Sequence, residues 1–101
     1  RYGGNFRGYK PKYAQEAGAV GCIIFSDPMD VGYMKGLPYP EGKFFSESTI
    51  QRGSVLVLDY TGDPLTPFEP ALPLDGAKQV KRLKPEEVPF LKIPVTPIGY
   101  G

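Results

Sequence analysis

The stretch from Tyr9 to Asp30, YKPKYAQEAGAVGCIIFSDPMD, decides the fold that the sequence predicts. Its first half predicts a helix of about two turns, because Pro11 is tolerated in a first helical turn and Gly18 can end a helix in the left-handed conformation. Its second half, from Ala19 to Phe25, is an apolar β-rich run typical of strands covered on both faces. A helix, a glycine, a buried strand and a following loop form half of an α/β crossover unit.

Most of the remaining chain predicts loops. Residues 1–8 form a glycine-rich turn, and residues 26–53 contain no periodic segment of regular structure. A loop of that length in a small domain is usually functional or packed against another surface. Residues 75–89 are polar and charged, which predicts a solvated connection with a weak helical tendency.

Two further strands are predicted. The sequence VLVL at Val55–Leu58 is one candidate, and the segment from Ile93 to Ile98 is the other. The second must lie at a sheet edge, because Pro94 and Pro97 lack the N–H group that a central strand donates. Prolines also exclude a central strand or helix within residues 62–70. The fold class is therefore α/β, with a small sheet, one or two short helices and long loops.

The composition is that of one small folded domain. The chain has 101 residues, of which 13 are glycine and 12 are proline, a share that borders on disorder. However, 41% of the residues are hydrophobic and the net charge is only +1, whereas disordered chains combine low hydrophobicity with high net charge. The balanced charge gives no general attraction for nucleic acid or anionic membranes. No apolar run approaches the ~20 residues of a membrane-spanning helix.

The residue types exclude most catalytic centres from this segment. It has no histidine and a single cysteine, Cys22, which excludes Ser-His-Asp and Cys-His centres and an ordinary zinc site. Cys22 lies inside the apolar run, where a buried thiol acts as a small hydrophobic group. The carboxylates of residues 27–69 lie in turn contexts, where such side chains bond to nearby backbone groups. The segment GGNFRG lacks the Lys-Ser/Thr ending of a phosphate-binding loop.

Two arginines, Arg7 in FRG and Arg52 in QRG, are each followed by glycine. A guanidinium that projects from such a turn matches the geometry of a carboxylate, to which it can donate two hydrogen bonds. An arginine in a loop can equally be a solvated surface residue, and the spacing alone does not separate the two interpretations.

The order of several motifs resembles one known group of domains. Six motifs follow one another along essentially the whole chain: RYG..FRG, AQEAGAVGCIIFSDPMD, YPEG, QRGSV, GDPLTP and IPVTPIGY. They resemble the protease-associated domain of the glutamate carboxypeptidase and transferrin receptor group. The resemblance implies that residues 1–101 are an apical domain of the swivelling β/β/α fold. It would be a piece of a larger protein, in which it covers the active-site cleft of a peptidase domain with two zinc ions.

The resemblance also implies roles for individual residues. The arginine of FRG, here Arg7, would bind the free α-carboxylate of the C-terminal residue of a peptide substrate. The asparagine that normally follows QRG and assists is replaced by Ser54, which puts a preference for glutamate in doubt. Thr66 and Glu69 in and after GDPLTP match carbonyl donors to a structural calcium ion, although the family more often has an aromatic residue at the second position.

For the parent protein, the resemblance implies a zinc-dependent carboxypeptidase. Its partners would be the peptidase domain of the same chain, a peptide substrate and a second copy in a homodimer. The long loop after SDPMD would lie over the peptidase domain with Tyr33, Met34, Tyr39, Phe44 and Phe45, unless these side chains cover the domain's own core. The sequence itself leaves the compartment open; an extracellular, periplasmic or membrane-anchored ectodomain suits the group best.

Two alternatives stay open. The chain can be an interaction module of a transferrin-receptor-like protein without zinc, although a carboxylate-binding arginine has no use there. It can also be a protease-associated module of another protease, which QRG and GDPLTP disfavour. The zinc ligands in the sequence that follows Gly101 would separate the first alternative from an enzyme.

Overall fold

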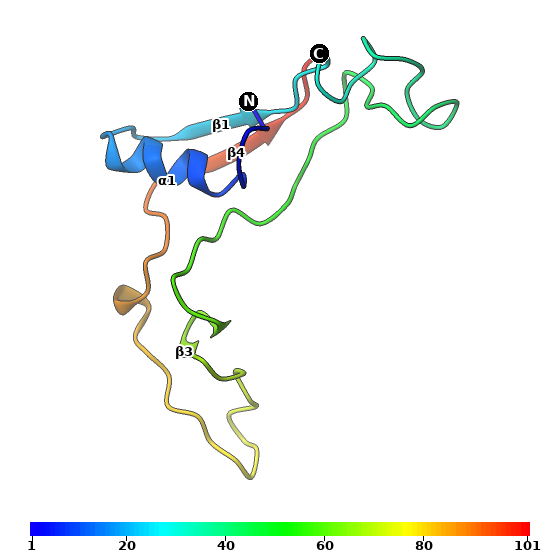
Figure 1. The fold of residues 1–101 in the computed structure, drawn as a ribbon. Coiled ribbons are helices and arrows are strands. Elements are labelled where there is room, and N and C mark those ends of the chain that lie inside the picture. The colour runs from blue at the N-terminus through cyan, green and yellow to red at the C-terminus, as the bar shows by residue number, and fades with distance from the viewer. The chain divides into compact units, whose positions relative to one another are not determined.

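A computed structural model describes all residues from 1 to 101 (Figure 1). The chain forms two units, one of residues 1–55 and 91–101 and one of residues 56–90, called here the first and second units. The regular elements are few and short: α1 (Tyr9–Glu16), β1 (Cys22–Phe25), β2 (Gly62–Asp63), β3 (Thr66–Pro67), the 3-10 helix η1 (Pro85–Glu87) and β4 (Val95–Ile98). The predicted α/β class with long loops is confirmed. Neither helix has the length and apolar character needed to cross a membrane.

Helix α1 begins and ends as the sequence predicts. Pro11 is buried at the third helical position, within the first turn, where its missing N–H costs no hydrogen bond. At the other end, Gly18 has φ +90° and donates to the Gln15 carbonyl, while the Ala19 amide donates to the Ala14 carbonyl. This pair of hydrogen bonds is a Schellman motif, which satisfies the last carbonyls of the helix.

In the first unit, β1 and β4 form a parallel pair, with Cys22 opposite Val95 and Phe25 opposite Ile98 (Figure 1). The strands predicted at these two places are therefore confirmed. The expectation that β1 is covered on both faces is wrong, because Ile24 is 2% exposed whereas the adjacent Ile23 is 66% exposed. Alternate side chains of a strand point to opposite faces, so the chain covers only the face that carries Ile24.

The long loop after β1 is confirmed, because residues 26–53 contain only turns, bends and isolated bridges that join Gly32 to Phe45 and Pro38 to Phe44. Tyr33, Met34 and Tyr39 are exposed as expected, whereas Phe44 and Phe45 are half-buried. A loop with this many exposed apolar side chains presents a surface suited to further packing.

The second unit departs most from expectation. The strand predicted at Val55–Leu58 does not form, and the regular pairing lies instead within the proline-rich segment, where β2 and β3 make a two-residue antiparallel ladder. Pro67 is tolerated in this ladder because a two-stranded sheet has only edge strands. The weak helical tendency predicted for residues 75–89 corresponds to the single turn of η1. Val80 and Val88 are the buried hydrophobic side chains of this unit.

Candidate functional site

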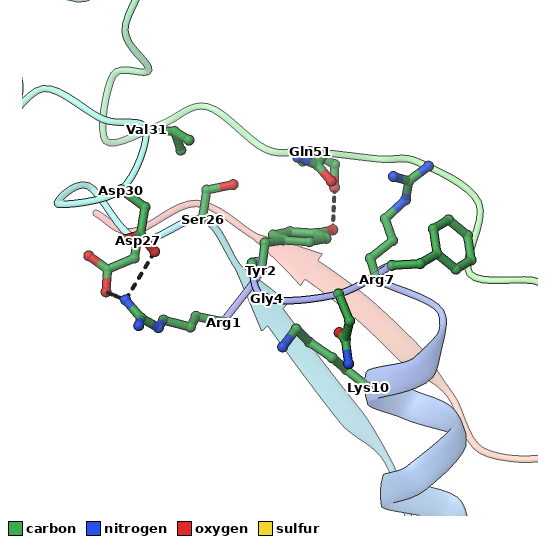
Figure 2. A pocket seen from close by; sticks show the side chains of 13 residues that line it. Arg1, Tyr2, Gly4, Arg7, Lys10, Ser26, Asp27, Asp30, Val31 and Gln51 are labelled. Atoms are coloured by element: carbon green, nitrogen blue, oxygen red, sulfur yellow. Dashed lines mark hydrogen bonds and ion pairs between the residues drawn. The ribbon is translucent and has the colours of Figure 1, made fainter.

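The candidate site in the first unit is built around Arg7, which ends the glycine-rich turn just before α1 (Figure 2). Two neighbours hold its guanidinium. The Cζ atom lies 5.2 Å from the centre of the Phe6 ring, a cation–π distance. The guanidinium also lies so close to the Gly53 backbone that a Cβ atom at position 53 would overlap the Cζ, Nη2 and Nε atoms of Arg7. The side chain is therefore packed in place although it is charged.

No carboxylate neutralises Arg7. Both ion pairs of the structure belong to Arg1, and the Arg7 guanidinium makes no hydrogen bond. Its Nε atom is buried without a hydrogen-bond partner. A bulky ligand therefore cannot reach the side of the guanidinium that carries Nε. The edge formed by the two Nη atoms is the part that can still donate two parallel hydrogen bonds to a carboxylate.

An open cleft of about 670 Å³ is lined by Arg7 and twelve other residues of the first unit. Figure 2 shows the side chains of the lining residues. The Tyr2 hydroxyl donates to the Gln51 carbonyl at 2.7 Å, which ties the glycine-rich turn to the segment that carries Gly53. Lys10, on the first turn of α1, lines the same cleft, as does Ser26, whose Oγ atom is buried without a hydrogen-bond partner.

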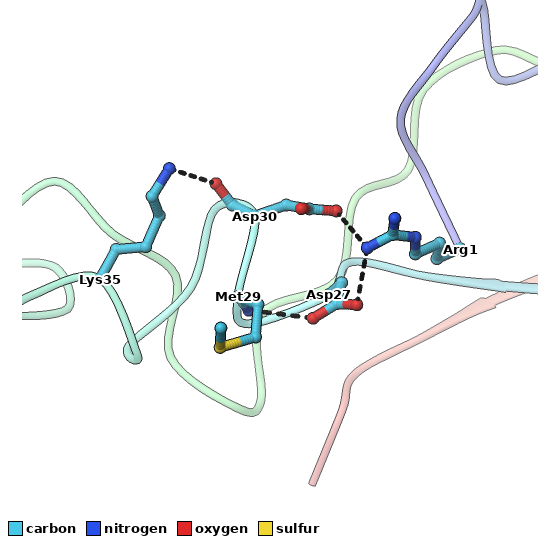
Figure 3. A network of polar contacts seen from close by, with 5 residues as sticks. All are labelled: Arg1, Asp27, Met29, Asp30 and Lys35. Carbon is cyan, nitrogen blue, oxygen red and sulfur yellow. Dashed lines mark hydrogen bonds and ion pairs between the residues drawn. The ribbon is translucent and has the colours of Figure 1, made fainter.

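The acidic residues of the cleft are engaged by Arg1 (Figure 3). The Arg1 Nη1 atom lies 3.0 Å from an oxygen of Asp27 and 3.0 Å from an oxygen of Asp30. The Met29 backbone amide donates to the other Asp27 oxygen at 2.9 Å, and the Lys35 ammonium donates to the Asp30 backbone carbonyl. The Met29 amide, and after it the Arg1 guanidinium, lower the pKa of Asp27 below its ordinary value of 3.8.

The resulting charge distribution favours an anion beside Arg7. Asp27 and Asp30 are paired with Arg1, and the first turn of α1 contains no acidic residue. The positive end of the helix dipole therefore adds to the charge of Arg7. The Tyr9, Lys10 and Lys12 amides contribute no binding group, because they donate to carbonyls of Phe6, Arg7 and Gly8. The guanidinium is the principal group that can bind a ligand there.

The other predicted residues fall in two places. Ser54 is exposed and follows Gly53 directly, so it lies next in the chain to the residue on which Arg7 packs. Arg52 is exposed, as expected for a surface arginine. Thr66 and Glu69 belong to the second unit.

The structure brings Thr66 and Glu69 together. The Thr66 hydroxyl donates to the Glu69 carbonyl at 2.9 Å, and the Glu69 amide donates to the Thr66 carbonyl at 3.0 Å. The Glu69 carbonyl also accepts from the Asp63 amide at 3.2 Å, so a cation there would meet an oxygen that already accepts two hydrogen bonds. No group of three or more His, Cys, Asp or Glu side chains surrounds them, so a calcium ion would need carboxylates from outside these residues.

The chain resembles curated peptidases along its whole length. It is 39% identical over 104 aligned residues to the glutamate carboxypeptidase 2 homolog of Caenorhabditis briggsae and to aminopeptidase NAALADL1 of Mus musculus, in each case over 99% of this chain. A probable glutamate carboxypeptidase of Arthroderma benhamiae is 52% identical over 71 residues, or 65% of this chain. The chain is homologous to a segment of these peptidases. No protein-family model matches it.

The chain spans a small part of these relatives, 13% of the length of the first two and 10% of the third. The relatives include a carboxypeptidase and an aminopeptidase by name at the same identity, so similarity alone assigns neither activity to this chain. The geometry around Arg7 is the relevant additional evidence.

The sequence did not predict three parts of the candidate site. It found Arg7 but not its contacts with Phe6 and Gly53, and it gave no role to Ser26. The glycine of QRG was the available signal for the Gly53 contact, since a glycine beside a functional arginine often permits close approach. Nothing in the sequence shows that the Ser26 hydroxyl is buried without a partner.

Proposed function

We propose that the chain is the protease-associated apical domain of a zinc-dependent carboxypeptidase, and that Arg7 binds the C-terminal carboxylate of the peptide substrate. The observation that supports this is a guanidinium held in position by Phe6 and Gly53 and neutralised by no carboxylate. Homology to glutamate carboxypeptidases over the whole chain supports the same function.

The proposed role of Arg7 is to bind and orient the substrate. Its Nη atoms donate two hydrogen bonds to the carboxylate, which fixes the substrate end and places the last peptide bond in the cleft of the peptidase domain. Zinc in that domain would supply a bound hydroxide as nucleophile. In this proposal the segment, which contains no histidine, contributes binding rather than a catalytic base.

Ser54 and the Thr66–Glu69 turn have secondary roles in this proposal. Ser54 would assist at the carboxylate, although its side chain is shorter than asparagine; it follows Gly53, which Arg7 contacts. The Thr66 and Glu69 carbonyls would bind a structural calcium ion together with carboxylates of the peptidase domain. The exposed apolar side chains of the loop, among them Met34 and Tyr39, would pack on that domain.

The test uses the complete protein, including any sequence that flanks these residues, with Arg7→Ala. We compare peptides with a free C-terminus and the same peptides amidated at the C-terminus. For the free peptides we expect KM to rise about tenfold to a hundredfold with a smaller fall in kcat, the loss typical of a charge-assisted hydrogen-bond pair. For the amidated peptides, Arg7→Ala should leave KM unchanged.

Arg52→Ala is the matched control, because Arg52 is exposed, is also followed by glycine and forms no ion pair. It should leave KM within about twofold of the parent value. An unchanged KM for the free peptides in Arg7→Ala would refute the proposed role of Arg7. A complete protein that cleaves none of the peptides would instead favour the alternative, an interaction module whose peptidase domain binds no substrate.

A further inference from the structure

We infer that Gly53 is a positioning residue for Arg7: its missing side chain provides the space that sets the orientation of the guanidinium. The inference rests on the proposed function and adds to it a residue that determines how the carboxylate is met. Gly53 and Arg7 both belong to the first unit, and their contact joins residues that are 46 positions apart in the sequence.

The requirement for glycine at position 53 comes from space and not from the backbone. Gly3, Gly4, Gly18 and Gly62 have φ between +87° and +109°, a conformation that favours glycine. Gly53 is not among the glycines of positive φ, so any residue can adopt its backbone conformation. What an alanine there would meet is the Arg7 guanidinium, at the Cζ, Nη2 and Nε atoms.

The contact matters for binding because it limits which edge of Arg7 meets a ligand. Nε is buried against this backbone without a partner, and the Phe6 ring holds Cζ at 5.2 Å. An arginine side chain has many rotamers, and holding one of them before the substrate arrives lowers the entropy cost of binding. With the Nε side closed, the carboxylate meets the two Nη atoms.

Adding a methyl group at position 53 should therefore move Arg7 and not the fold. The atoms that an alanine would overlap are the far end of a flexible side chain, which shifts more easily than backbone. The displaced guanidinium keeps its charge but loses its alignment. Two parallel hydrogen bonds depend on that alignment, whereas long-range attraction does not.

The experiment measures kinetics in the complete protein for Gly53→Ala, Arg7→Ala and the double variant. We expect Gly53→Ala to raise KM for peptides with a free C-terminus about tenfold, with kcat changed less and amidated peptides unaffected. In the Arg7→Ala background the same substitution should add nothing, because the group through which it acts is gone.

Gly21→Ala is the matched control. It makes the same chemical change in the same unit, and a Cβ at Gly21 would meet Pro94 at 3.6 Å, an ordinary contact distance. This variant should keep the parent KM.

The outcomes separate this inference from the proposed function. If Arg7→Ala leaves KM unchanged, the proposed function fails. If Arg7→Ala raises KM but Gly53→Ala does not, only the positioning role of Gly53 is overturned. The positioning role is also overturned if Gly53→Ala raises KM, or lowers the melting temperature, as much in the Arg7→Ala background as alone, because glycine is then needed by the backbone.

Discussion

Arg1 and Arg7 lie at the two ends of one glycine-rich turn, and the structure uses them in opposite ways (Figures 2 and 3). Arg1 donates to both Asp27 and Asp30 from a single nitrogen, at 3.0 Å in each case. Arg7 has no acidic partner and packs instead on a ring and on backbone. The first arginine joins the turn to the loop after β1, and the second retains its charge for a ligand.

The difference comes from where the carboxylates lie and not from the arginines themselves. Asp27 and Asp30 follow β1, and the turn passes that end of the strand because the Tyr2 amide donates to the Phe25 carbonyl at 2.9 Å. Arg1 precedes Tyr2 and reaches both carboxylates. Arg7 lies six residues after Arg1, just before α1, whose first turn contains no acidic side chain.

Charge reversal at each arginine is the variant pair with the largest expected effect. We expect Arg7→Glu to raise KM for free-carboxylate peptides about a hundredfold or more, because a like charge then faces the substrate, with little change in stability. Arg1→Glu should leave KM close to the parent value and lower local stability, because it places three carboxylates together. KM measures the effect on substrate binding, and hydrogen exchange of residues 1–30 measures the effect on local stability. Equal changes in KM from both substitutions would contradict the division of roles.

Alanine at Gly4 tests whether the turn itself holds the two arginines apart. Gly4 has φ +87° with no atom near a prospective Cβ, so Gly4→Ala introduces backbone strain without a clash, at a cost of about 1–2 kcal/mol. Gly18→Ala is the matched control, with φ +90° and equally open surroundings at the other end of α1. We expect similar increases in local hydrogen exchange from both variants and a raised KM only from Gly4→Ala. A raised KM from Gly18→Ala alone would show that α1, and not the turn, positions Arg7.

Much of the first unit could be predicted from the sequence because its signals are local. Pro11 and Gly18 mark the start and the end of α1 through their own backbone conformations, and the apolar run predicted β1. β4 was predicted as an edge strand from its prolines, and it is one of only two strands in its sheet. The sequence could not show that Ile23 stays exposed, because burial of the second face depends on a partner that local patterns do not describe.

The second unit could be predicted less well because its pairing is set by geometry over a few residues. The apolar VLVL favoured a strand through propensity, which is a weak guide without a pairing partner. The β2–β3 ladder forms in the segment where the prolines exclude a central strand but not an edge strand, and the Thr66–Glu69 hydrogen bonds close the adjoining turn. For the site, FRG identified Arg7, but its lack of an ion pair depends on the three-dimensional course of the loop after β1, which brings Asp27 and Asp30 to Arg1.

The smallest predicted effect concerns pH, and it tests how the carboxylates that neutralise Arg1 are held. The lowered pKa of Asp27 in the folded state means that its carboxylate stabilises the fold above the unfolded-state pKa of 3.8. This stabilisation is lost as the pH falls from that value through the lower pKa of the folded state. We therefore expect Asp27→Asn to reduce local stability by a constant amount near neutral pH, and the difference from the parent to shrink below about pH 4.

Hydrogen exchange of residues 25–31 at several pH values measures this dependence in the complete protein. Asp59→Asn is the control, since Asp59 is an exposed carboxylate that forms neither an ion pair nor a side-chain hydrogen bond. If the difference between parent and Asp27→Asn instead grew as the pH fell, the protonated form of Asp27 would be the stabilising one. The Met29 amide and Arg1 would then not be the groups that hold the carboxylate, and the account of how Arg1 is neutralised would have to be abandoned.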